Sequence, residues 1–157
     1  ELPTDNRDAR EIFDKDLEPF KRLISEDKLN AIMPAHVIYP SIDAESTAGF
    51  SSIWLQQILR DQFGFNGLIY SDDLSMEGAA VSGSPSVRAE KAKAAGCNVL
   101  LICNDREAAQ EIVATVREKQ WPLRRLESMK AKPLAPTDLY ISTDWEDALA
   151  CVQPLLA

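Results

Sequence analysis

The sequence has no long apolar segment and fewer basic than acidic residues. No apolar run approaches the roughly 20 residues that a helix needs to cross a bilayer, so we expect no membrane-spanning segment. The chain has 17 lysines and arginines against 25 aspartates and glutamates, which gives a formal net charge of −8. Nucleic acids and anionic membrane surfaces attract proteins with an excess of positive charge. We therefore expect neither a nucleic acid nor a membrane as a partner.

Cysteine and histidine are scarce. Cys97, Cys103 and Cys151 are an odd number without the spacing of a disulfide framework, which favours reduced thiols and a cytoplasmic location. If Cys97 and Cys103 share one strand, they lie about 20 Å apart, whereas a disulfide needs Cα atoms within about 7 Å. His36 is the only histidine. A single histidine after a strand more often bonds to the backbone than takes part in catalysis, although a strand end also favours a binding role.

Apolar segments that recur along the chain predict a repeated strand–helix unit. We expect buried strands at residues 30–36, 67–71 and 98–103. Near-continuous apolar strands are typical of a parallel sheet that is covered on both faces, so the sequence indicates an α/β fold. Three strands do not decide between an open doubly wound sheet and part of a barrel.

Helices are predicted from apolar residues at helical spacing and from capping residues at their ends. The expected helices cover residues 8–27, 51–63, 84–95, 105–119, 122–130 and 144–156, with a loop at 40–50 and a Gly/Ser-rich connection with room for one helical turn at 74–83. The expected N-caps are Asp8 or Asn6, Ser51 or Ser52, Ser84 before Pro85, and Asn104 or Asp105, and Gly64 and Gly96 are expected to end helices.

The pair Asp72-Asp73 is the sharpest chemical feature. It directly follows an expected buried strand, and in parallel α/β folds the chemistry gathers at the carboxyl ends of the strands. Successive strand residues point to opposite sides, so one carboxylate can face a pocket while the other faces the protein. A carboxylate held there can act as a nucleophile, a base or a metal ligand. A helix cap is the competing role, and for the bare residues it is slightly the more common one.

The acidic pair lies within the segment Leu68-Ile-Tyr-Ser-Asp-Asp-Leu-Ser-Met-Glu-Gly-Ala-Ala80. This segment resembles the nucleophile segment of the bacterial β-N-acetylhexosaminidases of glycoside hydrolase family 3. Further similar segments, in the same order as in the family, are Ala31-Ile-Met-Pro-Ala-His-Val-Ile-Tyr39, Trp54-Leu-Gln-Gln-Ile-Leu-Arg60 with Phe63-Gly-Phe-Asn-Gly67, and Ala94-Ala-Gly-Cys-Asn98 with Leu101-Ile-Cys-Asn104. The resemblance covers about residues 1–120, and an ordered set of this kind is far more specific than one motif.

The resemblance implies part of a TIM-type (β/α)8 barrel. A full barrel usually needs about 250 residues, so residues 1–157 would be the C-terminal portion of a single catalytic barrel, with about its last three strands and their helices. Residues from about 121 to 157 would then form a C-terminal helical extension. The partner that this fold requires is the N-terminal half of the same barrel. The absence of an initiator methionine also leads us to expect a fragment or a processed chain.

The resemblance also implies an activity and its residues. Asp72 matches the nucleophile of a retaining β-N-acetylglucosaminidase, which removes N-acetylglucosamine from 1,6-anhydromuropeptides during peptidoglycan recycling. The acid/base of the family is a histidine in an upstream Asp-Ser-His loop, and His36 does not match its position. We expect Met33, His36 and Met76 to bind the sugar or muropeptide substrate, with no metal and no organic cofactor. Residues 1–157 alone should then be inactive.

Two other interpretations remain open. An acidic pair at a strand end also fits a phosphoacceptor or Mg²⁺-binding signalling domain. Such domains place the acidic pair after their first strand, whereas here it follows the second expected strand. The other interpretation is a fragment that serves as a scaffold and has no catalytic role.

Overall fold

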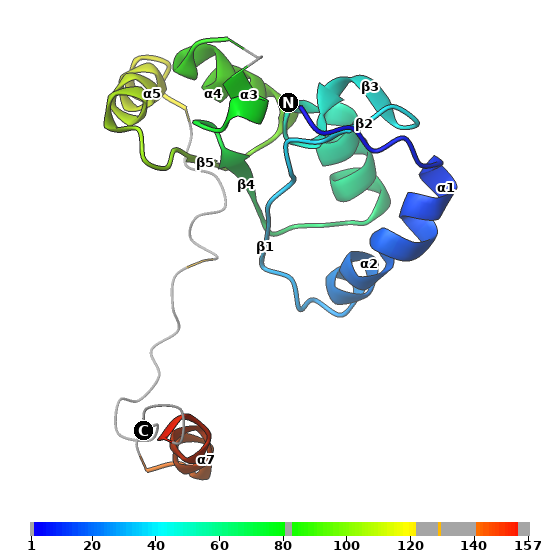
Figure 1. The fold of residues 1–157 in the computed structure, drawn as a ribbon, viewed down its shortest axis with the longest axis vertical. Helices are drawn as coiled ribbons and strands as arrows, with labels where there is room; N and C mark the ends of the chain where they lie inside the picture. The colour runs from blue at the N-terminus through cyan, green and yellow to red at the C-terminus, as the bar shows by residue number, and fades with distance from the viewer. Residues whose placement is uncertain (1, 81–82, 122–128, 130–140, 154–157) are drawn as a thin grey trace.

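The computed structural model describes the chain except for residues 1, 81–82, 122–128, 130–140 and 154–157. Its centre is a parallel sheet of three strands in the order β1 (Ala31–Ile32), β4 (Leu68–Asp73) and β5 (Val99–Leu101). The expected strands are confirmed, but two of them are shorter than predicted and β4 extends through the acidic pair. Figure 1 shows a helix after each strand of this sheet, preceded by a hairpin in the case of β1, and this is the repeated unit that the sequence predicts.

The helices lie close to their expected positions. The first is interrupted, with α1 (Ala9–Glu11) leading through a π-helical turn, η1 (Ile12–Asp16), into α2 (Glu18–Ser25). The others are the π-helix η3 (Ile53–Gln62), the single turn α3 (Glu77–Ala80), α4 (Pro85–Ala95), α5 (Arg106–Glu118) and α7 (Thr143–Val152). The helix predicted at 122–130 falls almost entirely outside the described residues. None of the described helices combines the length and the apolar composition that spanning a bilayer requires.

The caps account for these boundaries. The side chains of Asp8, Ser84 and Asp105 accept hydrogen bonds from backbone amides in the first turns of α1, α4 and α5. Ser51 Oγ accepts from the amide of Trp54 at the start of η3, at 3.2 Å. Each bond satisfies one of the amides that a helix start leaves without a partner. Where the sequence left two candidates for a cap, these bonds identify Asp8, Ser51 and Asp105.

The prediction of a loop at residues 40–50 is partly wrong. This region forms an antiparallel hairpin of β2 (Ile38–Tyr39) and β3 (Asp43–Thr47), followed by the 3₁₀ turn η2 (Ala48–Phe50). The amide of Ile42 donates to the carbonyl of Tyr39 across the hairpin turn at 2.8 Å, and the Asp43 carboxylate at the start of β3 accepts from the amides of Glu45 and Ser46. Because the strands are short and β3 is polar, their sequence has the composition of a loop.

The core lies between the sheet and the helices that cover it. Its most deeply buried side chains include Ile12, Leu55, Phe65, Leu68 and Ile69. Trp54, which the helical spacing places in the core, is 8% exposed. In contrast, α7 contains no buried residue.

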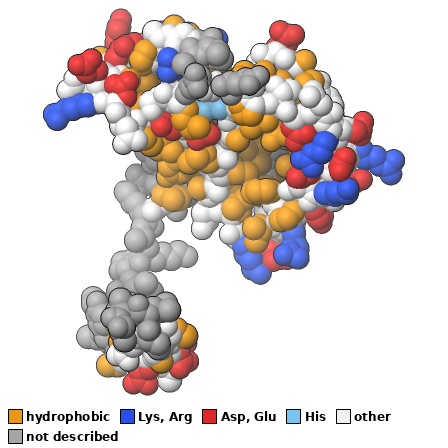
Figure 2. Space-filling view, viewed as in Figure 1, with side chains coloured by type: hydrophobic (Ala, Val, Ile, Leu, Met, Phe, Trp, Pro, Cys, Tyr) orange, Lys and Arg blue, Asp and Glu red, His pale blue; other side chains and the backbone are white. Residues whose placement is uncertain are grey.

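Both outer strands of the described sheet have apolar hollows beside them. A cavity of about 270 Å³ lies along β1 and includes Ile32, Met33 and Phe20 in its lining. A larger one, of about 590 Å³, lies along β5 and includes Val99 and Trp121. Figure 2 shows hydrophobic side chains gathered on the visible face of this region. Each of these two strands pairs with β4 and with no other strand among the described residues.

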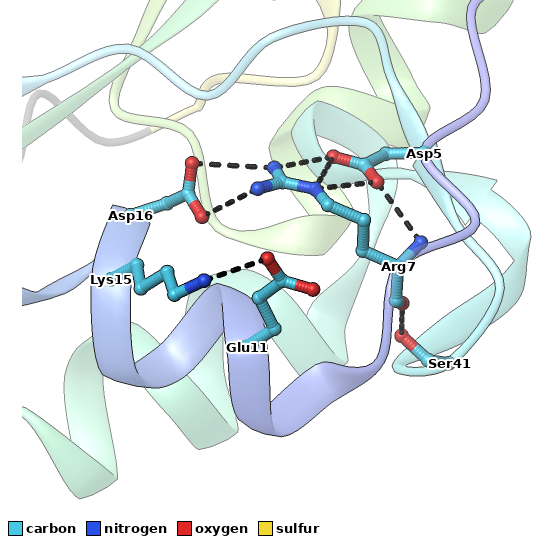
Figure 3. Close-up of polar contacts among 6 residues, drawn as sticks. All are labelled: Asp5, Arg7, Glu11, Lys15, Asp16 and Ser41. Atoms are coloured by element: carbon cyan, nitrogen blue, oxygen red, sulfur yellow. Dashed lines mark hydrogen bonds and ion pairs between the residues drawn. The ribbon is translucent and has the colours of Figure 1, made fainter.

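The first residues of the chain are fixed across the hairpin. Thr4 forms a parallel bridge with Ile38 in β2. The Arg7 guanidinium pairs with both Asp5 and Asp16, and the Arg7 carbonyl accepts from Ser41 Oγ (Figure 3). The hydrogen bonds that Arg7 donates to Asp5 lower the pKa of the Asp5 carboxyl, and those that it donates to Asp5 and Asp16 raise the pKa of Arg7. The segment that enters the described fold is thereby tied to η1 and to the hairpin turn.

Candidate active site

The acidic pair occupies the last two positions of β4. Asp72 is partly buried, and its Oδ1 accepts a hydrogen bond from the amide of Asp73 at 2.8 Å. Within the described part of the chain, this is the only hydrogen bond found for the Asp72 carboxylate. A carboxylate with one oxygen oriented and the other uncommitted is suited to attack an electrophile or to accept a proton.

Asp73 is engaged by the protein. Its carboxylate accepts from the amide and the hydroxyl of Ser75, at 2.9 and 2.7 Å, and from the amide of Cys103 at 2.9 Å. Burial is the largest single influence and raises the pKa of Asp73, but together these hydrogen bonds outweigh it, so the pKa lies below its ordinary value. Asp73 therefore joins the ends of β4 and β5 as a charged acceptor.

The third strand end contributes to this junction. The amide of Cys103 bonds to Asp73, and the carbonyl of Cys103 accepts from Ser75 Oγ at 2.7 Å. Asp105 caps α5, as the sequence predicts. Sequence reasoning missed the part played by Ser75 and by the Cys103 backbone, and the only sequence signal was their position just after two strands.

His36 is in contact with the carboxyl end of β4. Its side chain is buried, with the residue 3% exposed, and Nε2 lies 3.2 Å from the carbonyl oxygen of Asp73. The ring also packs against Phe50, with 5.2 Å between ring centroids. Nδ1 is shielded from solvent and makes no hydrogen bond within the described structure. The expected backbone bond is present, and the expected sugar contact stays a prediction.

The two methionines are more open. Met33 follows β1 and is 50% exposed, and Met76 follows β4 and is 47% exposed. Met33 also lines the cavity beside β1. Exposure of this extent leaves both side chains accessible to a ligand or to another part of the protein. Their role in binding sugar stays a prediction.

The described residues contain neither a disulfide bond nor a cluster of ligands for a metal ion. All three cysteines are free, with Cys97 buried and Cys103 and Cys151 exposed. The first two flank β5 rather than lying in it. No group of three or more histidines, cysteines or carboxylates is placed to hold a metal ion among the described residues.

A family model and the relatives matched by sequence agree on one family of proteins. The model described as the glycosyl hydrolase family 3 N-terminal domain matches residues 1–132. A β-hexosaminidase from Pseudomonas aeruginosa is 47% identical over 153 residues, which are 97% of this chain and 45% of that protein. A β-hexosaminidase from Tolumonas auensis is 52% identical over 129 residues, which are 82% of this chain and 38% of that protein.

A solved structure agrees with these relatives. NagZ from Neisseria gonorrhoeae, in complex with N-trifluoroacetyl-D-glucosamine, superposes with a TM-score of 0.71 at 31% identity. The match covers 100% of this chain and 45% of that protein. The chain thus spans less than half the length of the relatives that it matches.

Proposed function

Because the chain belongs to glycoside hydrolase family 3, we propose that it forms part of a retaining β-N-acetylglucosaminidase in which Asp72 is the nucleophile. This assignment rests on the difference in hydrogen bonding between the two aspartates. Asp73 accepts several hydrogen bonds from the protein, whereas Asp72 accepts one, which orients it. A nucleophile must keep an oxygen available for the anomeric carbon, and Asp72 meets that requirement.

We further propose that residues 1–157 are the C-terminal portion of a (β/α)8 barrel. The parallel order β1-β4-β5, with a helix after each strand, supports this arrangement. The apolar hollows along β1 and β5 are what a barrel cut at two strand pairs leaves behind. The N-terminal half of the barrel would fill both, and residues from about 121 would extend beyond the barrel.

In the proposed reaction, Asp72 attacks the anomeric carbon while an acid protonates the leaving oxygen. Water then releases the sugar from the covalent intermediate with retention of configuration. The acid/base would be a histidine in the N-terminal half, so residues 1–157 alone would be inactive. Met33 and Met76 are proposed sugar contacts because both are accessible at strand ends. His36 could take part only if its shielded ring became accessible.

The substrate is proposed from the relatives. Those matched by sequence are named β-hexosaminidases, and the gonococcal NagZ structure holds an N-acylated glucosamine. We propose that this protein removes N-acetylglucosamine from 1,6-anhydromuropeptides in the cytoplasm, as part of peptidoglycan recycling, without a metal or organic cofactor. The relatives give no support to the signalling-domain interpretation.

The test compares three variants of the complete polypeptide. Asp72→Asn should abolish cleavage of an aryl β-N-acetylglucosaminide and preserve binding of N-acetylglucosamine, because it removes the step that forms the glycosyl intermediate. Asp73→Asn should reduce stability or alignment but retain measurable turnover. Asp61→Asn, an exposed carboxylate in η3, is the matched control and should behave as wild type.

Labelling identifies the nucleophile independently. A fluorinated mechanism-based N-acetylglucosaminyl inhibitor should attach to Asp72, as located by peptide mass mapping. A label on Asp73 or outside this segment would overturn the assignment, as would near-wild-type kcat in Asp72→Asn.

A further inference from the structure

We propose that His36 is a positioning residue, which aims Asp72 through Asp73, and that it does not contact the sugar. The inference rests on the proposed function of Asp72. Its basis is a set of contacts that we call the Asp73 lock, formed by Asp73, His36, Ser75 and Cys103.

The Asp73 lock holds every polar group of that residue. The amide donates to Asp72 Oδ1, the carboxylate accepts from Ser75 and Cys103, and the carbonyl accepts from His36 Nε2 at 3.2 Å and from the amide of Met76 at 3.1 Å. The amide is the only group that orients the Asp72 carboxylate within the described structure. Any rotation of the Asp73 backbone therefore turns the nucleophile.

His36 supplies a part of the lock that the other members cannot. Ser75 and Cys103 hold Asp73 from the β4 and β5 side, whereas His36 reaches it from the segment that follows β1, 37 residues earlier in the chain. The three sheet strands are thereby joined through one residue at their carboxyl ends. Loss of the His36 bond would leave the Asp73 carbonyl with the Met76 amide alone and would remove the hydrogen bond that joins Asp73 to the segment after β1.

The chemistry of the ring favours this role over a sugar contact. A carbonyl oxygen only accepts hydrogen bonds, so Nε2 must carry a proton and donate it to the Asp73 carbonyl. Nδ1 is shielded from solvent, and Nε2 is already engaged with the Asp73 carbonyl. Neither nitrogen therefore presents a free polar atom to a ligand.

The packing around the ring is tight. A Cβ on Gly78 would lie 3.2 Å from His36 Cβ, and one on Gly49 would lie 3.7 Å from Nδ1. The ring also contacts Phe50, and its burial restricts how far it can move. A rigid donor aimed at the nucleophile strand is the expected property of a positioning residue.

The experiment uses the complete polypeptide and separates kcat from KM. His36→Leu removes the donor, and His36→Gln replaces it with an amide that can reach the same carbonyl. With an aryl β-N-acetylglucosaminide, His36→Leu should lower kcat by up to about 100-fold, the effect of a misplacement of about 1 Å in a catalytic group. Its KM should stay within about threefold, since no sugar contact is lost. His36→Gln should recover most of the activity.

The rate of covalent labelling gives a second readout. The fluorinated inhibitor reports attack by Asp72 directly, so its rate should fall in His36→Leu in parallel with kcat. Gln56→Met is the matched control, because it also removes a side-chain bond to a backbone carbonyl, that of Ala95, at the far end of the sheet. It should change neither rate.

A second variant, at Ser75, tests the proposal if His36→Leu fails to fold. Ser75→Ala removes one donor to the Asp73 carboxylate and should lower kcat several-fold with KM unchanged. The proposal is overturned if Ser75→Ala has wild-type kcat, if His36→Leu changes KM more than kcat, or if His36→Gln is as impaired as His36→Leu. If wild type itself does not cleave the substrate, the proposed function fails instead.

Discussion

Replacing Gly67 by alanine tests how closely β1 and β4 approach each other. Gly67 stands directly before β4, where the amide of Leu68 donates to the carbonyl of Asn30 at 2.9 Å. A Cβ at position 67 would lie 2.7 Å from the carbonyl carbon of Asn30 and 2.6 Å from Phe65 Cζ. One neighbour is backbone and the other is a fully buried ring, so neither can rotate away.

The expected cost follows from these contacts. Overpacking a well-filled site costs about 1–3 kcal/mol, and we expect Gly67→Ala to reach about 3 kcal/mol because β1 itself must shift. Gly64→Ala is the matched control, since Gly64 has a φ of 71° and no atom within 4 Å of an added Cβ. Its left-handed backbone costs about 1–2 kcal/mol, offset by about 0.4–1 kcal/mol from the unfolded chain. We therefore expect a net loss of about 1 kcal/mol.

The assay is urea unfolding of both variants of the complete polypeptide. The midpoint should fall further in Gly67→Ala than in Gly64→Ala, with the slope m unchanged, since the surface exposed on unfolding is the same. If Gly67→Ala is no less stable than Gly64→Ala, the close approach of β1 and β4 is refuted.

Two further predictions concern titratable groups. The pKa of Asp73 is lowered in the folded protein, so its stabilising effect is present above the unfolded value of about 3.9 and is lost as the pH falls through the folded value. Asp73→Asn should thus be less stable at neutral pH and converge with wild type in acid, as urea unfolding at several pH values would reveal; parallel curves would contradict this. Burial raises the pKa of Cys97 to about 12, so a thiol reagent at about pH 8 should modify exposed Cys103 and Cys151 first. Peptide mapping would show this, and after unfolding without reductant all three should react; a protected pair would contradict the prediction of free thiols.

Local signals in the sequence predicted most of the helices. Ser84 and Pro85 start α4 and Gly96 ends it, because each of these residues acts on the backbone within a few positions of itself. The hairpin at residues 38–47 was missed because pairing between distant positions, rather than local composition, makes Ile38 and Thr47 partners. The π-helical geometry of η1 and η3 likewise had no signal that we could use.

The sequence alone determined the order of the three strands of the parallel sheet, most of the helices and the position of the acidic pair at a strand end. Strand alternation also required the two carboxylates to face differently. Only the tertiary structure decided which of them is held by the protein, since Asp73 takes its partners from Cys103, 30 residues later, and from His36, 37 residues earlier. Those contacts depend on how β1, β4 and β5 align in the sheet, and that alignment joins segments far apart in the chain, which no local signal specifies.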